Sequence, residues 1–348
     1  MGKRPVLAIT MGDAAGIGAE IAVKALEKKE IYDRCIPVVI GDYEPMAEAV
    51  EFTNSGLKIN RIEDPVQAKG ELGTIDMIDM GFLEPRGWEY KKVSAKTGGA
   101  SYHYIVKGIE LAMDGSVHAV VTGPINKEAF NAAGYHFAGH TEIFAHHTHC
   151  NNYAMMLTSK DLRVIHCTTH VSMREACDRV TKERVLNVIK LADEALRLMG
   201  IEDPKIGVAG LNAHCSENGL FGDEEQKWII PAVEQAKAEG YHVDGPVPPD
   251  TVFVKALAKQ YDIVVAMYHD QGHIPLKLSG FKLNLETNRY ESMSGINTTV
   301  GLPVIRTSVD HGTAFGKAGE GRANEESMVE AIDLAIIMAN NKFPELSE

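Results

Sequence analysis

Short apolar runs alternate with amphipathic stretches along most of this 348-residue chain. The runs at 6–10, 36–40 and 119–122 are rich in β-branched residues, and each is followed by glycine within two residues, as buried parallel strands often are. The stretches at 99–113 and 181–199 carry apolar residues at the spacing of one helix face. The pattern predicts an α/β protein with helices on both faces of a mostly parallel sheet, a three-layer α/β/α architecture.

A second packed unit is expected, because 348 residues allow about two domains of ordinary size. No Pro/Ser-rich linker or internal repeat separates two halves, so we expect the second subdomain to be interleaved with the first. The polar segment 281–295 is expected to form a long surface excursion. Further strands are predicted at 153–157, 163–168, 205–211 and 263–267, and further helices at 19–29, 224–239 and 325–340.

The charge balance and the cysteines exclude several classes of protein. With 35 basic and 48 acidic residues the formal net charge is −13, which opposes attraction to nucleic acid or to an anionic membrane. No apolar run approaches the roughly 20 residues that a membrane-spanning helix needs. The five cysteines are odd in number and show no CxxC spacing, so we expect no disulfide framework and place the protein in a reducing cytoplasm.

Two segments rich in glycine and alanine lie next to predicted helices. The turn at 12–18 joins the first predicted strand to the first predicted helix, where backbone N–H groups can receive an anion or a nucleotide. Alternatively, its glycines serve only a tight turn. The segment 310–324 precedes the last predicted helix and suits close approach by a flat ligand, or it is a connector with Asn324 as helix N-cap.

Three histidines, His170, His214 and His269, each follow a predicted strand. Ligands of open α/β sheets bind where the strands end. Three neutral imidazoles meeting there would hold Zn²⁺ or a similar divalent ion and leave coordination positions for a substrate. The alternative is that each is an ordinary polar residue among the 14 histidines of the chain.

Lys277, Asn297 and Arg306 lie within or just beyond the His269 region. Cationic side chains are the usual counterparts of carboxylate and phosphate, and arginine binds both in a bidentate manner. The alternative is that they are surface charges of an acidic protein. Arg306 is the stronger candidate, because it follows the apolar run 300–305 and precedes the polar pair 307–308.

Five motifs in a fixed order resemble those of a known family. They are Gly139-His-Thr-Glu142, Thr168-Thr-His170, Gly210-Leu-Asn212 with His214, Tyr268-His-Asp-Gln-Gly272, and the stretch from Gly301 to Ala314. From about Leu7 to the last predicted helix, the chain resembles the 4-hydroxythreonine-4-phosphate dehydrogenases, a family that includes D-threonate and D-erythronate 4-phosphate dehydrogenases. The last motif is also similar to the adenine-side loop of isocitrate and isopropylmalate dehydrogenases.

The resemblance implies the two-subdomain fold of isocitrate and isopropylmalate dehydrogenases. It assigns the cofactor side to about 1–125 plus 300–348, and the metal, substrate and dimer side to 126–299. It also implies a homodimer with an active site shared across the interface. NAD or NADP would be the cofactor, together with a divalent metal ion, zinc ahead of magnesium, cobalt, manganese and nickel.

The resemblance also implies roles for individual residues. The metal ligands would be His170, His214 and His269, with Asp250 beside the metal. The substrate contacts would be His140, Thr141, Lys277, Asn297 and Arg306, and the catalytic residues Lys277, His140 and Asp250. The cofactor would contact Gly12, Asp13, Gly16, Asp310, His311, Gly312, Thr313 and Asn324.

The implied reaction is metal-dependent, NAD(P)-linked oxidation of the β-hydroxyl of a 4-phosphorylated four-carbon acid, followed by decarboxylation. The acid would be 4-phospho-hydroxy-L-threonine, or D-threonate or D-erythronate 4-phosphate giving dihydroxyacetone phosphate. His273 and Ile274 favour the sugar-acid branch over the vitamin B6 branch, while Ala14, Ala19 and the stretch 212–216 depart from the family's usual residues. The alternatives are a dehydrogenase of an aromatic cis-dihydrodiol acid, a metallohydrolase, and a non-catalytic phospho-ligand-binding protein.

Overall fold

The computed structural model describes residues 3–285, 289–293 and 295–346. The chain divides into two compact units, Met1–Cys150 with Leu302–Glu348, and Asn151–Gly301. The first unit is therefore built from both ends of the chain, and the second is inserted in its sequence.

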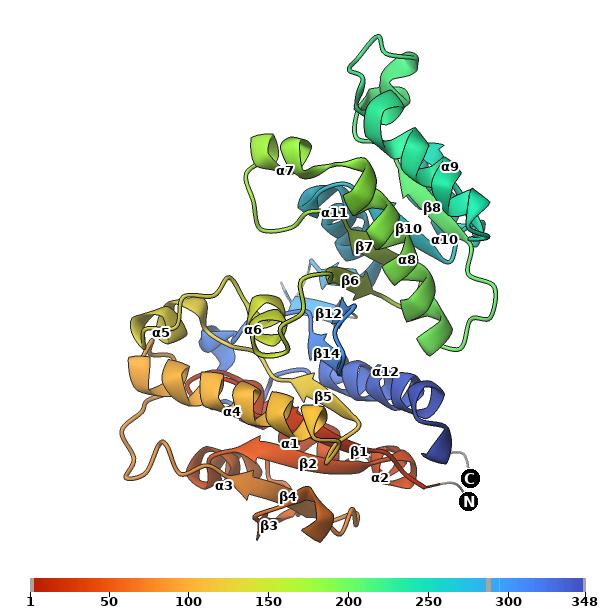
Figure 1. The fold of residues 1–348 in the computed structure, drawn as a ribbon. Helices are drawn as coiled ribbons and strands as arrows, with labels where there is room; N and C mark the ends of the chain where they lie inside the picture. The colour runs from red at the N-terminus through yellow and green to blue at the C-terminus, as the bar shows by residue number, and fades with distance from the viewer. Residues whose placement is uncertain (1–2, 286–288, 294, 347–348) are drawn as a thin grey trace. The chain divides into compact units, whose positions relative to one another are not determined.

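The first unit contains a parallel sheet with the strand order β3-β4-β2-β1-β5-β14 (Figure 1). Leu7, Ala8 and Ile9 on the central strand β1 are fully buried, which is why this strand is a continuous apolar run. The strands are β1 (Val6–Thr10), β2 (Ile36–Gly41), β3 (Lys58–Ile62), β4 (Thr74–Asp79), β5 (Ala119–Thr122) and β14 (Ile305–Val309).

Helices cover both faces of this sheet. Val120 on β5 lies under α4, where a Cβ on Gly108 would come within 3.1 Å of it. Thr307 on β14 pairs with Val121, so it points to the opposite face, and its hydroxyl donates to the Ala331 carbonyl of α12 at 2.8 Å. One group of helices is α4 (Ala95–Met113), α5 (Lys127–Ala132) and α6 (His140–His147); the other is α1 (Gly18–Leu26), α2 (Lys29–Arg34), α3 (Tyr43–Phe52) and α12 (Glu326–Lys342).

The segment 126–150 lies in the first unit, although the sequence placed it in the substrate-side subdomain. The reason is packing on α4. Tyr102 of α4 stacks on Tyr135 with ring centroids 3.7 Å apart, and its hydroxyl lies 2.7 Å from His147 Nε2. The boundary therefore falls after Cys150 and not after residue 125.

The second unit contains a mixed sheet with the strand order β13-β6-β7-β10-β8-β9. Strand β6 pairs antiparallel with both β7 and β13, whereas β7, β10, β8 and β9 run parallel. Strands β6 and β7 are joined by a tight turn, in which the Ser159 N–H donates to the Leu162 carbonyl. Parallel pairing would need a much longer crossover connection, so these two strands run antiparallel. The strands are β6 (Ala154–Thr158), β7 (Arg163–His166), β8 (Ile206–Ala209), β9 (Val243–Val247), β10 (Ile263–Ala266) and β13 (Ile296–Val300).

Two apolar clusters cover the two faces of this second sheet. Val265 on β10 packs in the cluster formed by α8 and α9, while its neighbour Val264 packs with α10 and α11. The sequence predicted one helix over 224–239, but a π-helical turn η3 (Glu225–Ile229) precedes α9, because Pro231 has no N–H to donate. The helices are α7 (Met173–Arg179), α8 (Lys182–Leu198), α9 (Ile230–Ala238), α10 (Val252–Leu257) and α11 (His269–Gly280).

The excursion at 281–295 is an antiparallel pair of strands in its described part, β11 (Phe281–Asn284) and β12 (Arg289–Met293). Residues 286–288 and 294 lie outside the described residues. Short 3₁₀ helices are η1 (Pro65–Gln67), η4 (Phe315–Lys317) and η5 (Pro344–Leu346), whereas η2 (Ala213–Glu217) is a turn with left-handed backbone. Among the described residues, no helix combines the length and the apolar character needed to cross a membrane.

Candidate functional site

A buried arginine lies in the first unit, and we call its surroundings the Arg306 cluster: Arg306, Thr122, His140, Glu142 and Phe144. Arg306 on β14 is 2% exposed. Its Nε and Nη2 donate to Thr122 Oγ1 at 3.3 and 2.9 Å, and its Cζ lies 5.8 Å from the Phe144 ring centroid. Strand pairing fixes this position: Arg306 of β14 is in register with Val120 of β5, and Thr122 lies two residues further along β5, on the same face of the sheet. The side chain is therefore held in place before any ligand arrives.

Arg306 keeps its charge in this position. Burial lowers the pKa of its guanidinium to about 9, and the Glu142 carboxylate acts in the opposite direction. The group is therefore protonated at neutral pH. A buried cation of this kind is suited to a carboxylate or phosphate.

His140 begins α6 beside this cation. Its Nε2 is buried and has no hydrogen-bond partner among the residues that the structure describes. Burial, together with the charge of Arg306, holds the pKa of this imidazole well below its usual range. A neutral imidazole with a shielded nitrogen next to a fixed cation can contact a hydroxyl or an anionic oxygen. Thr141, the next residue of α6, is also buried.

The glycine turn at 12–18 is buried throughout. Some of its N–H groups already have acceptors in the protein: Asp13 donates to the Pro124 carbonyl at 2.9 Å, and Gly16 donates to the Asp13 carbonyl at 3.0 Å. A Cβ on Gly12 would lie 2.4 Å from the Pro124 oxygen. These glycines therefore serve close packing of the backbone, and cofactor contacts by Gly12, Asp13 and Gly16 stay a prediction.

Asp13 is a fully buried carboxyl group in this turn. Its Oδ1 accepts from the Ala15 N–H at 2.9 Å. Burial raises the pKa of Asp13 to about 6, while the hydrogen bonds from Ala15 and Thr97 lower it. Desolvation therefore outweighs local hydrogen bonding at this residue.

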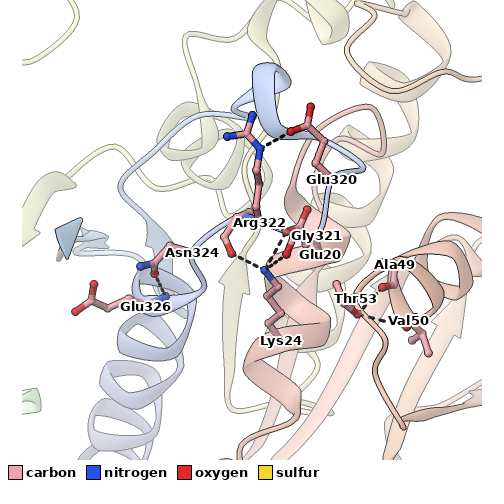
Figure 2. Close-up of polar contacts among 11 residues, drawn as sticks. Glu20, Lys24, Ala49, Val50, Thr53, Glu320, Gly321, Arg322, Asn324 and Glu326 are labelled. Carbon is pink, nitrogen blue, oxygen red and sulfur yellow. Dashed lines mark hydrogen bonds and ion pairs between the residues drawn. The ribbon is translucent and has the colours of Figure 1, made fainter. Parts of the chain in front are cut away.

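The segment 310–324 lies against the glycine turn. The Ile17 N–H donates to the Thr313 carbonyl at 3.1 Å, and a Cβ on Gly16 would lie 2.8 Å from Thr313. Both segments predicted to contact the cofactor thus lie together in the first unit. Asn324 has a structural role, since its Oδ1 accepts from the Glu326 N–H at 2.7 Å at the start of α12 (Figure 2).

The remaining predicted contacts in that segment are Asp310, His311 and Gly312. The Asp310 N–H donates to Ser327 Oγ at 3.3 Å, and His311 Nδ1 lies 3.0 Å from the Gly312 carbonyl oxygen. Gly312 is exposed, and apart from its two chain neighbours no atom of the described residues would lie within 4 Å of a Cβ there. The backbone at Gly312 is therefore open to a ligand.

The three candidate metal ligands lie in the second unit. The His170 and His269 rings are 5.8 Å apart between centroids. His214 lies on η2, 61% exposed, with its Nδ1 3.3 Å from Glu217 Oε1. Within the described residues of one chain, no three His, Cys, Asp or Glu side chains are placed to hold one metal ion. The structure thus brings His170 and His269 near each other and leaves His214 exposed.

The backbone that carries His214 is strained. Five consecutive residues, His214 to Asn218, have positive φ between 46° and 63°. Left-handed backbone costs a non-glycine residue of the order of 1 kcal/mol, and such strain concentrates at functional sites. The turn holds His214 out from the second unit.

A second imidazole supports His269. The rings of His269 and His273, one helical turn apart on α11, stack with centroids 3.6 Å apart and an interplanar angle of 11°. His273 Nδ1 also lies 2.9 Å from the His269 carbonyl oxygen. Burial and the neighbouring imidazole of His269 lower the pKa of His273 to about 4, so its ring is neutral. The buried His166 packs against Gly272 of the same helix. A Cβ on Gly272 would lie 2.4 Å from His166 Nε2, so this close approach requires glycine.

Three predicted residues of the second unit lie at separate places. Lys277 Nζ lies 5.2 Å from the Phe281 ring centroid, and Asn297 on β13 is half-buried opposite Leu157 of β6. Asp250 is exposed and lines a pocket of about 620 Å³ between α10 and α11. Much of that pocket is formed by exposed apolar side chains, including Val254, Ile274 and Leu278.

Comparison with known proteins gives a consistent result. The family described as pyridoxal phosphate biosynthetic protein PdxA matches residues 33–335. A protein of Oceanobacillus iheyensis, named "Putative D-threonate 4-phosphate dehydrogenase", is 46% identical over 344 residues, 98% of this chain and 100% of that protein. The chain belongs to the PdxA family.

Solved structures agree with this membership. The crystal structure of 4-hydroxythreonine-4-phosphate dehydrogenase from Klebsiella pneumoniae matches with a TM-score of 0.83 at 43% identity, covering 96% of this chain and 99% of that chain. A terephthalate 1,2-cis-dihydrodiol dehydrogenase from Burkholderia xenovorans matches with a TM-score of 0.67 at 29% identity, covering 96% and 98%. The resemblance read from the five motifs and the α/β fold class are both confirmed.

Sequence reasoning missed two members of the Arg306 cluster in this PdxA-family chain. Thr122 ends the predicted strand 119–122, so its place at a strand terminus was the available signal. Phe144 lies one helical turn after His140 on α6, but its apolar side chain carries no sign of a contact with Arg306. Glu142 stood within a quoted motif without an assigned role.

Proposed function

We propose that the chain is an NAD(P)-linked dehydrogenase that oxidises the β-hydroxyl of D-threonate 4-phosphate, with decarboxylation of the resulting β-keto acid to dihydroxyacetone phosphate and CO₂. The relative from Oceanobacillus iheyensis, similar over its whole length, supports this substrate by its name. The names of the solved relatives support 4-phospho-hydroxy-L-threonine as the second substrate to test. D-erythronate 4-phosphate, which differs from the first in configuration, is the third.

The Arg306 cluster carries the proposal. A protonated guanidinium that is 2% exposed and hydrogen-bonded to Thr122 is a fixed positive charge in a protein of net charge −13. We assign it, with His140 and Thr141, to an anionic end of the substrate. Lys277 and Asn297 of the second unit are proposed as further substrate contacts.

Proton transfer falls to residues of this chain. His140 is proposed to accept the hydroxyl proton, because its buried Nε2 has no hydrogen-bond partner among the described residues. Lys277 and Asp250 are the other proposed catalytic residues, and Lys277 has the donor needed to return a proton after CO₂ leaves.

His170, His214 and His269 are proposed to hold a divalent metal ion, zinc ahead of magnesium, cobalt, manganese and nickel. The donor set fits, since imidazole suits zinc and the His170 and His269 rings already lie 5.8 Å apart. When bound, the ion supplies Lewis acidity that makes a substrate hydroxyl easier to deprotonate. His214 is exposed on a strained turn and is proposed to act across a subunit interface.

NAD or NADP is proposed to bind along segment 310–324 and the glycine turn, where it supplies the hydride acceptor. The open backbone at Gly312 fits a ligand, whereas the N–H groups of Asp13, Gly16 and Ile17 in the turn already donate within the protein. Contacts are therefore proposed mainly from Asp310, His311, Gly312 and Thr313.

We also propose a homodimer in a reducing cytoplasm. The five cysteines form no disulfide. The pocket between α10 and α11 exposes Ile274 and Leu278 by 57% and 78%, an apolar surface suited to a second copy. Leu278→Glu should produce monomer in sedimentation analysis, whereas Val66→Glu, at an exposed position of the first unit, should not. A Leu278→Glu variant that stays dimeric would exclude this surface.

The first test is reduction of NAD and NADP, followed by absorbance, with the metal-loaded protein. D-threonate 4-phosphate, D-erythronate 4-phosphate and 4-phospho-hydroxy-L-threonine are offered in turn, each with and without a chelator. Chelator-sensitive reduction with D-threonate 4-phosphate is the expected result. Reduction with another of the three would correct the substrate, and phosphate release without reduction would indicate a metallohydrolase.

An aromatic cis-dihydrodiol acid is the second candidate substrate, because of the 29% identical dihydrodiol dehydrogenase structure. The same assay separates the two. Turnover of the dihydrodiol acid without turnover of any phosphorylated acid would replace the proposal, and binding of a phosphorylated acid without any turnover would indicate a binding protein.

A further inference from the structure

The Ala318–Ala323 loop, the glycine-rich segment between η4 and α12, lies against α1 (Figure 2). Gly319 and Gly321 have φ of +74° and +68°, which side-chain-bearing residues rarely adopt. A Cβ on Gly321 would lie 3.0 Å from the Phe52 carbonyl oxygen, and one on Gly319 would lie 2.9 Å from the Tyr90 ring. The loop therefore has a defined backbone shape, packed closely on its own unit.

Lys24 on α1 connects to the backbone of this loop. Its Nζ donates to the Gly321 carbonyl at 2.8 Å, to the Ala323 carbonyl at 2.7 Å and to Glu20 Oε1 at 3.0 Å. An ammonium group has three protons, so each one has an acceptor here. The contacts join residues almost 300 positions apart in the sequence.

Glu20, a buried residue of the same helix, contacts both Lys24 and the loop. Its side chain is 1% exposed, and its Oε1 also accepts from the Ala323 N–H at 2.6 Å. Its Oε2 is buried and has no hydrogen-bond partner in the described part of the chain. A carboxylate this buried needs a cation and hydrogen bonds to compensate for lost water, and Lys24 and the loop backbone supply them.

These contacts are separate from those that begin α12. At the start of that helix Asn324 Oδ1 accepts from the Glu326 N–H, and Lys28 of α1 forms a partly exposed pair with Glu325 at 3.1 Å. The buried pair instead bonds loop residues that precede Asn324. On the outer side, Glu320 pairs with Lys91 and Arg322. The Glu20–Lys24 pair therefore fixes the shape of the loop rather than the position of the helix.

We propose that Glu20 and Lys24 are positioning residues for the dinucleotide. They hold in one shape the Ala318–Ala323 loop, which connects the proposed cofactor contacts at 310–313 to Asn324, so that binding does not have to order this part of the segment. This inference rests on the proposed function, in which segment 310–324 contacts NAD or NADP. Neither residue is proposed to touch the reacting atoms.

The test compares four variants in the full-length, metal-loaded protein, one of which is Lys24→Arg, a substitution that keeps the positive charge. Lys24→Met leaves Glu20 buried without its cation, so Glu20→Gln/Lys24→Met is made as well, to remove both charges. Lys28→Met is the matched control, since it removes a partly exposed ion pair from the same helix. Trypsin cleavage after Arg322 reports loop opening, and calorimetric titration with NAD and NADP reports cofactor binding without substrate.

The double variant should be cleaved after Arg322 about tenfold faster than wild type and should bind the cofactor about tenfold more weakly. Its KM for the phosphorylated acid should stay within about twofold. Lys24→Arg should recover most of the cofactor affinity, and Lys28→Met should match wild type in both measurements.

Unchanged cleavage after Arg322 would show that the pair does not hold the loop. Faster cleavage with unchanged cofactor affinity would show that loop shape does not matter for binding, and either result overturns the inference while leaving the proposed function intact. Wild-type protein that binds neither NAD nor NADP would overturn both.

Discussion

The Arg306 cluster in the first unit and the histidines of the second unit are built in opposite ways. Arg306 is almost fully buried and is hydrogen-bonded to a neighbouring strand. His214 is 61% exposed on a strained turn, and no group of three potential ligands forms among the described residues of one chain. The packing of the first unit alone fixes the Arg306 cluster in place. The packing of the second unit does not bring its three candidate metal ligands together.

This difference in burial predicts how substitutions in each region affect the stability of the folded protein. A buried charge contributes to the folded state as well as to binding, so changing it alters both. An exposed ligand can be changed with little effect on folding. Substitutions in the two regions should therefore separate into those that change activity alone and those that change stability as well.

The largest effect is expected from His214→Ala. Turnover should fall by roughly a thousandfold or more as the metal is lost, because the Lewis acid contributes several kcal/mol. The melting temperature should change by less than about 2 °C, since the side chain is exposed. Metal content and reduced-nicotinamide formation are measured together, with exposed His242→Ala as control. Retained metal and turnover would remove His214 from the site.

Arg306→Met is expected to raise KM for the phosphorylated acid by about a hundredfold, because a charge-assisted contact is lost. KM for the dephosphorylated analogue should rise less than threefold. Unlike His214→Ala, this change should also shift the melting temperature, since Arg306 is buried. Arg34→Met, which removes an exposed ion pair of the same unit, is the control. Equal effects on both substrates would contradict a phosphate contact.

The pH dependence of the unfolding free energy of Asp13→Asn tests whether burial destabilises the ionised Asp13 carboxylate. The pKa of Asp13 is raised to about 6 in the folded protein, so the folded state holds this proton more tightly than the unfolded chain does. Its ionisation therefore lowers stability as pH rises from about 4 to 6. The variant should match wild type near pH 3.5 and gain up to about 3 kcal/mol in unfolding free energy by pH 7.5.

Denaturant unfolding at several pH values measures this gain. Asp250→Asn in the second unit is the comparison, and its effect on the unfolding free energy should be small because Asp250 is exposed. A gain for Asp13→Asn that does not grow with pH would show that its carboxyl is not destabilised by burial.

The smallest effect is expected from His273→Leu. Loss of the ring stacked on His269 should weaken zinc binding about tenfold, as changes behind a metal ligand commonly do. His273→Phe keeps a flat ring and should lose less. Competition with a zinc-binding dye measures both affinities. Equal affinities for wild type and His273→Leu would mean that His269 needs no such support.

Local sequence pattern predicted several of the strands that are buried on both faces, but it missed β4 and β14, which are buried as well. The strand at 119–122 has the bounds of β5, and 6–10 has those of β1. Strand β3, with four of its five residues at least partly exposed, has no apolar run and was missed. The antiparallel pairing of β6 also escaped prediction, because strand direction depends on how the chain turns and not on which residues are apolar.

The sequence by itself determined the alternating α/β architecture, the family, and the side chains available for chemistry, because periodicity and motif order are local properties. Only the tertiary structure decided which of them are buried and what they contact. Thr122 and Arg306 meet across 184 positions, and Lys24 reaches Gly321 across 297. Burial and such contacts set the charge state of Arg306, Asp13 and His140, and they depend on packing that no local stretch of sequence contains.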